Sequence, residues 1–197
     1  MLNIKKLAML FLSTLAISSL SYAETSKYGV TVSQCNFDYD NVDFCTDSKM
    51  KAYAKALKTH KPNFDKNQIL YIFEEDKSLM DEPESYIKNY YRAVVINTKD
   101  KTVSPAGFGI TEAKDYDGNP IPVNNKGELL EYDFNVKSNK FCFKGNWNQY
   151  RRGTRYDGEP YCFIYEKEST NKYKTFQFDV NWYVVIGSTY YSDKKRP

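Results

Sequence analysis

The segment between Cys142 and Cys162 combines cationic and aromatic side chains over a short length. Side chains of these types supply contact area, stacking and forked hydrogen-bond donors, and they dominate the energetics of many binding surfaces. A disulfide around the segment would lower the entropy cost of ordering it. We therefore expect a partner-binding loop that fits an acidic cleft on a protein or glycan. Its candidate contact residues are Trp147, Tyr150, Arg151, Arg152, Arg155 and Tyr156. The alternative is a solvated hairpin tip whose Trp147 folds back onto a sheet.

A single histidine limits the catalytic chemistry open to the chain. His60 stands at the expected end of a helix, where a cation complements the carbonyl terminus. One histidine excludes a metal centre with several histidine ligands, and it is the only histidine that could activate a nucleophile. Acids are abundant, so the enzymatic alternative is a carboxylate-based glycan hydrolase with two carboxyls about 5 to 10 Å apart. No spacing singles out such a pair, and we assign no catalytic residue.

Two acidic segments are weak candidates for a metal site. Asp38, Asp40 and Asp43 offer hard oxygen ligands of the kind that calcium prefers, which leaves a calcium-assisted hydrolase as a further alternative. The segment from Asp115 does not match an EF-hand loop, because Pro120 replaces the required glycine and Lys126 replaces the final glutamate. Short acidic loops are usually solvated, so we expect no cofactor.

Four cysteines indicate two disulfides. Local pairing, Cys35 with Cys45 and Cys142 with Cys162, asks least of the backbone because each pair brackets a turn-rich segment. The other two pairings stay open at this level. A zinc site made of four thiolates is disfavoured, since no pair of cysteines has the two-residue spacing of such sites.

Residues 1–23 have the pattern of a secretory signal peptide. Lys5 and Lys6 precede an apolar run, and Ala23 ends a small-residue cleavage site. The run is shorter than a spanning helix of about 20 residues, so no stable membrane anchor is expected. Removing residues 1–23 takes away two lysines and no acid, and the formal charge falls from +3 to +1. A nearly neutral exported chain is not expected to bind nucleic acid.

The remaining residues, 24–197, are expected to form a single disulfide-stabilised β-rich domain. Thr46 and Asp47 can cap a helix that runs to Lys58, with its apolar residues on one face. About eight strands follow from alternating or continuous apolar patterns. They are centred on residues 28–33, 69–73, 90–97, 102–110, 130–136, 139–145, 160–166 and 176–186. The fold class is therefore α+β, mainly antiparallel β, as a single curled sheet, a sandwich or an open barrel with one N-terminal helix.

These features favour a soluble exported binding protein. Its concrete form is a periplasmic or secreted inhibitor or immunity-type protein that binds a macromolecular partner through the basic aromatic loop. The alternatives are the secreted hydrolases named above and a structural envelope or virulence component that assembles through exposed sheet edges. The sequence leaves the partner and the oligomeric state open.

Overall fold

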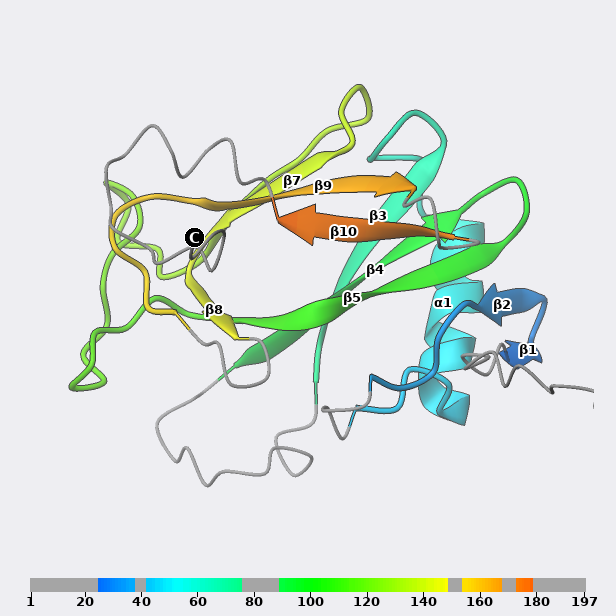
Figure 1. Ribbon diagram of the computed structural model, residues 1–197, viewed down its shortest axis with the longest axis horizontal. Coiled ribbons are helices and arrows are strands. Elements are labelled where there is room, and N and C mark those ends of the chain that lie inside the picture. The colour runs from blue at the N-terminus through cyan, green and yellow to red at the C-terminus, as the bar shows by residue number, and fades with distance from the viewer. Residues whose placement is uncertain (1–24, 38–41, 76–88, 149–153, 168–172, 179–197) are drawn as a thin grey trace, which may run out of the picture.

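The computed structural model describes residues 25–37, 42–75, 89–148, 154–167 and 173–178. One helix and ten strands lie in this part of the chain (Figure 1). They are β1 (Thr25–Lys27), β2 (Val30–Val32), α1 (Asp47–Thr59), β3 (Gln68–Glu74), β4 (Tyr90–Asn97), β5 (Thr102–Thr111), β6 (Glu131–Asp133), β7 (Lys140–Lys144), β8 (Asn146–Asn148), β9 (Tyr161–Lys167) and β10 (Lys174–Phe178).

The first sheet has the order β1-β2-β5-β4-β3, and β8 also pairs with β5. All its pairings are antiparallel except that of β2 with β5, where Thr31 lies opposite Thr102. The β4–β5 register shifts between Arg92 and Val94, whose partners on β5 are Gly109 and Pro105. The sheet is therefore mixed, whereas the sequence favoured mainly antiparallel pairing.

The second sheet is wholly antiparallel in the order β10-β9-β7-β6. Its central strands, β7 and β9, place Cys142 directly opposite Cys162, and the two residues form a disulfide. Cys35 and Cys45 form the other disulfide. The local pairing expected from the sequence is thus confirmed. Two disulfides indicate an oxidising environment for the folded chain.

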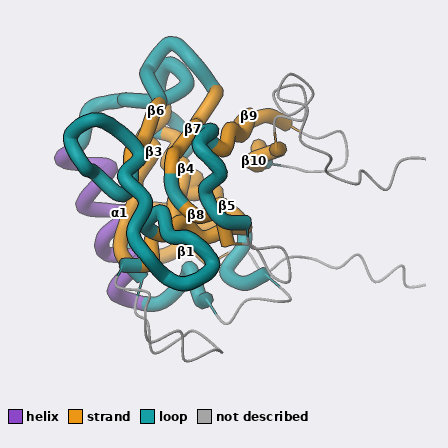
Figure 2. The backbone as a smooth tube through the Cα atoms, turned by 90° about the vertical axis from the view of Figure 1, so that its left-hand side faces the viewer, coloured by secondary structure: helices purple, strands orange, loops and turns teal. Residues whose placement is uncertain are grey.

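The molecule has three layers, with α1 on one face of the first sheet and the second sheet on the other (Figure 2). Alternation along β4 explains this arrangement. Val94 and Ile96 pack in the cluster that contains the helix, while Ala93 and Val95 pack in the cluster shared with the second sheet. The α+β, mainly β class is confirmed, as two packed sheets rather than one sheet or a barrel.

The helix begins and ends where its sequence predicts. Thr46 is the N-cap, and its side chain accepts a hydrogen bond from the Lys49 amide. Met50 and Tyr53 are buried on the face toward the sheet. His60 follows the last turn, is exposed, and lies edge-on to the ring of Tyr71, consistent with a surface position at the helix end.

Three strands differ from the expectation. The first one is a hairpin, because Tyr28 and Gly29 both have positive φ and turn the chain between β1 and β2. The strand expected over residues 130–136 is reduced to β6, since Asn135 begins a turn in which its carbonyl accepts the Ser138 amide. Of the strand expected over 176–186, only residues up to Phe178 lie within the described chain.

Candidate functional site

The predicted binding loop leaves the first sheet at β8. Trp147 pairs with Ile110 of β5, and its backbone exchanges two hydrogen bonds with Thr154, at 3.1 and 2.8 Å. These bonds close the base of a hairpin. Tyr150, Arg151 and Arg152 come between Trp147 and Thr154 in the sequence and lie outside the described residues.

Two aromatic residues of the predicted loop contribute to the core. The half-buried ring of Trp147 packs against Tyr161 and Phe163, with ring centroids 5.9 and 5.8 Å away. Tyr156 is 8% exposed, and its hydroxyl donates to the Gly158 carbonyl at 2.9 Å. The ring of Trp147 therefore folds back onto the sheet, as in the alternative interpretation of the loop. Among the described residues, the candidate contact surface of the loop is left mainly to Arg155, which is half-buried.

A buried amide joins this hairpin to the loop that follows β5. Asn146 is 1% exposed, and its Oδ1 accepts the backbone N–H of Tyr156 at 2.8 Å and that of Lys114 at 3.3 Å. Its Nδ2 donates to the Lys114 carbonyl at 3.3 Å. One side chain thus satisfies backbone groups from two loops, which fixes them side by side. The spacing of residues gave no sign of this link.

The loop after β5 carries an exposed aromatic ring on a braced turn. Asp115 Oδ1 accepts hydrogen bonds from the backbone N–H groups of Asp117 and Asn119 at 2.9 and 2.8 Å. Its Oδ2 accepts one from the side-chain Nδ2 of Asn119 at 2.9 Å. These bonds, that from the Asn119 side chain first, lower the pKa of Asp115. Tyr116 stands on this turn with 90% of its surface exposed. Tyr116 is not among the contact residues expected from the sequence, although an aromatic residue two positions before Gly118 in an Asp-rich turn was an available signal.

In both acidic segments, a carboxylate accepts hydrogen bonds from backbone N–H groups of its own turn. The carboxylate of Asp115 is occupied by the three hydrogen bonds of its own turn. Asp43 and the sulfurs of Cys35 and Cys45 offer ligand atoms within 4.8 Å of one another, but the sulfurs are bonded as a disulfide. The Asp43 carboxylate accepts the Cys45 N–H at 2.7 Å. The other weak candidates, Asp38 and Asp40, lie outside the described residues.

In the described part of the chain, every carboxyl group with a shifted pKa has a lowered one. The pKa of Glu131 is lowered, mainly by the hydrogen bond from Lys144. The pKa values of Asp47 and Asp115 are lowered too, by the donors around each group. A general acid of a hydrolase needs a raised pKa, so these three groups suit ionised, hydrogen-bonded roles.

Comparison with known proteins gave no match: no family model, no curated protein and no solved structure resembles this chain. No helix in the described part of the chain has the length and apolar character needed to cross a bilayer.

Proposed function

We propose that this protein is an exported binding protein that contacts a macromolecular partner through its loop end. The loop end is formed by residues 112–130 and 154–160, which gather on one side of the molecule (left in Figure 1). The observation that carries the proposal is the exposed ring of Tyr116 on a turn braced by Asp115. An aromatic side chain held in place before binding loses little entropy when a partner covers it.

The hairpin beside this turn supplies the charge. Arg155 belongs to the loop end, and Arg151 and Arg152 precede it in the sequence. Because Asn146 holds the Lys114 and Tyr156 backbones together, Tyr116 and Arg155 belong to one surface. An aromatic ring on the same surface as an arginine fits a partner with an acidic surface.

Export is part of the proposal. The disulfides are stable in an oxidising compartment, and residues 1–23 have the signal-peptide pattern. A periplasmic or secreted inhibitor or immunity-type protein combines these properties, because such a role needs shape and charge rather than a titrating catalyst. The downward pKa shifts of Asp47, Asp115 and Glu131 make these three carboxyls unsuited to be the general acid of a carboxylate-based hydrolase.

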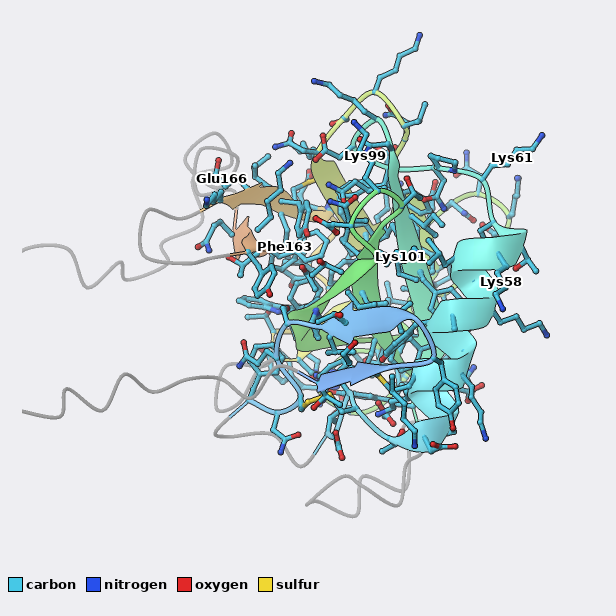
Figure 3. All side chains as sticks on the ribbon, turned by 90° about the vertical axis from the view of Figure 1, so that its right-hand side faces the viewer. Lys58, Lys61, Lys99, Lys101, Phe163 and Glu166 are labelled. Atoms are coloured by element: carbon cyan, nitrogen blue, oxygen red, sulfur yellow. A yellow bond between two sulfur atoms is a disulfide. The ribbon has the colours of Figure 1, made fainter. Side chains whose placement is uncertain are left out.

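The test compares partner capture by four forms of the mature protein. Immobilised wild type, Tyr116→Ala and the triple variant Arg151→Ala, Arg152→Ala, Arg155→Ala are incubated with envelope and extracellular extracts of the native source. The control changes Lys58, Lys61 and Lys99 to Ala. These lysines are exposed and lie at the end opposite the loop end (Figure 3). Their substitution removes three positive charges, as the triple arginine variant does.

The expected result is a partner whose recovery falls about tenfold or more in both loop variants and is kept by the lysine control. Equal thermal melting temperatures of all four forms make the comparison valid. Equal recovery of every partner by all four forms would reject the loop end as the contact surface.

A further inference from the structure

A hollow of about 580 Å³ lies on the second sheet, over β6, β7 and β9. Phe141 and Phe143 of β7 are buried in the core, so Lys140, Cys142 and Lys144 of the same strand face outward. We call this space the outer hollow. Its volume is within the range of roughly 300 to 1,000 Å³ that small-ligand sites occupy.

The Cys142–Cys162 disulfide explains why the outer face is hollow there. The strand register places Asp133 opposite Cys142 and Cys142 opposite Cys162. Three short side chains, one from each of β6, β7 and β9, therefore lie in a row across the sheet. Lys140 and Lys144 lie two positions away on either side along β7. Long side chains around a short covalent bridge leave a basin with the disulfide as its floor, and Pro160 also lines it.

The outer hollow has balanced formal charges. Glu131 and Asp133 contribute two carboxylates from β6, and Lys140 and Lys144 contribute two amines from β7. Glu131 and Lys144 are joined at 3.0 Å, which fixes one donor and one acceptor at the end of the hollow. A ligand with a large net charge of either sign would gain little from this set.

The carboxylate of Asp133 is available to a ligand. Its residue is exposed, and no hydrogen bond or ion pair of its side chain occurs within the described residues. Asn135 and Ser138 add an amide and a hydroxyl to the lining. Ser138 Oγ accepts the Lys140 N–H at 3.0 Å, which leaves its own hydrogen to donate elsewhere. Both hydrogen-bond acceptors and donors thus line the outer hollow.

We infer that the outer hollow is a binding site for a neutral glycan. Sugar hydroxyls both donate and accept, so neighbouring hydroxyls can bond to Asp133 and to the lysines, amide and hydroxyl around it. The C–H face of the sugar ring would lie over the disulfide and Pro160. Pro160 is the one lining residue that also belongs to the loop end, and the outer hollow gives the protein a second ligand of a different chemical class.

The test uses defined probes and amide chemical shifts. Uncharged trisaccharides of glucose, mannose, galactose and N-acetylglucosamine are titrated to roughly 10 mM into isotopically labelled mature protein. At least one of them is expected to move the amide signals of residues 131–144, 161 and 162, with an affinity that changes little between low and high salt because the ligand is uncharged.

Two substitutions make the test specific. Asp133→Asn should weaken binding about tenfold by removing a charged acceptor. Glu166→Gln is the matched control, because Glu166 shares the outward-facing positions of β9 with Cys162 but does not line the hollow, and it should bind as the wild type does (Figure 3).

Three outcomes would overturn the inference: no trisaccharide shifts these amides, Glu166→Gln weakens binding as much as Asp133→Asn, or only charged probes such as the dipeptide Lys-Glu shift them. Partner capture by the loop end should be unchanged in Asp133→Asn, so failure of one proposal is distinguishable from failure of the other.

Discussion

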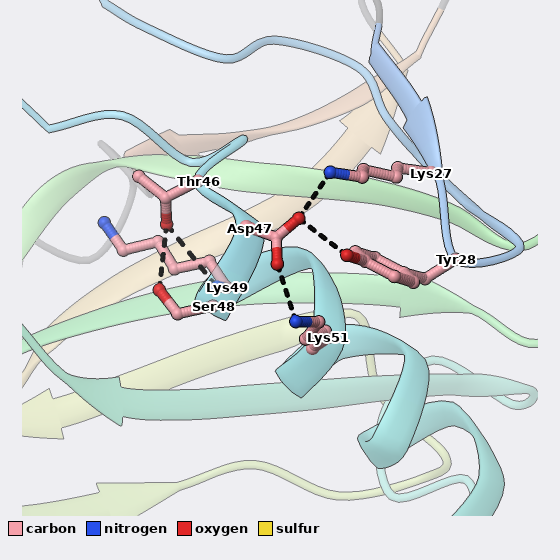
Figure 4. A network of polar contacts seen from close by, with 7 residues as sticks. All are labelled: Lys27, Tyr28, Thr46, Asp47, Ser48, Lys49 and Lys51. Carbon is pink, nitrogen blue, oxygen red and sulfur yellow. Dashed lines mark hydrogen bonds and ion pairs between the residues drawn. The ribbon is translucent and has the colours of Figure 1, made fainter.

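Tyr28 donates its phenol hydrogen to the Asp47 carboxylate at 2.6 Å and thereby ties the β1–β2 hairpin to the first turn of α1 (Figure 4). Lys27 and Lys51 bond to the same carboxylate. Asp47 therefore connects three donors from two elements, and it stands at the helix N-terminus, where negative charge is favourable.

Asp47→Asn should lower the melting temperature at pH 7. The hydrogen bond from Lys27 first, and then those from Lys51 and Tyr28, hold the pKa of Asp47 below its ordinary value. A carboxyl whose pKa is lowered by folding stabilises the protein above its unfolded-state pKa of about 4, and this stabilisation is lost as the pH falls through the folded-state value. Thermal melts of wild type and variant should therefore differ at pH 7, and the difference should shrink progressively as the pH falls below about 4 toward the lowered folded-state pKa. Asp117→Asn, an exposed turn position, is the control; an equal shift in both variants would contradict the prediction.

Glu75→Ala should destabilise the fold by about 3 kcal/mol, because it leaves the amine of the largely covered Lys49 side chain without its carboxylate. Lys49 Nζ and Glu75 Oε2 lie 2.8 Å apart. The side chain of Lys49 is 13% exposed and that of Glu75 is 4% exposed. The double variant Lys49→Met, Glu75→Leu removes both charges and should lie within about 1 to 2 kcal/mol of the wild type. Urea denaturation measures both. A double variant less stable than Glu75→Ala would show that the ion pair is not the reason.

Removing the second-sheet disulfide should cost about 3 kcal/mol. Cys142 and Cys162 close a loop of 20 positions, and the cross-link restricts the unfolded chain. Guanidinium denaturation of Cys142→Ala, Cys162→Ala measures the loss. Peptide mapping without reduction should recover only the two local disulfides in wild type; peptides linking Cys35 or Cys45 to either other cysteine would contradict the fold.

Asn146→Ala should loosen the loop end. The substitution leaves the backbone N–H groups of Lys114 and Tyr156 without their shared acceptor, at a cost of about 2 kcal/mol. Hydrogen exchange at these two amides should accelerate more than exchange in β3 and β4. Asn125→Ala, at an exposed turn position, should leave exchange unchanged. Unchanged protection in Asn146→Ala would remove the argument that one side chain fixes both loops.

Local features of the fold were predictable from the sequence. Thr46 begins the helix because its side chain caps an apolar-periodic segment, and the disulfides join the cysteines nearest in sequence. The β4–β5 hairpin follows from its polar turn between apolar runs. Each of these depends on residues close together in the chain.

Features made by distant residues were not predictable. Tyr28 alternates with Val30 and Val32 as a strand residue does, yet it adopts φ of 56° in a turn, and its hydroxyl bonds to Asp47. Asn146 looks like an ordinary loop asparagine until Lys114 is brought beside it. The outer hollow likewise requires β6, β7 and β9 in register. No single segment contains these arrangements, so local patterns leave them undetermined.

The parallel pairing of β2 with β5 constrains the order of assembly. The helix, β3 and β4 lie between the two partners in the chain, and synthesis from the N-terminus completes the β1–β2 hairpin long before β5 exists. A two-stranded hairpin is marginal in water by itself. The β1–β2 hairpin can therefore pair with the first sheet only after β5 has been synthesised. In a nascent chain that ends before Thr102, Val30 and Val32 of β2 have no β5 to pair with.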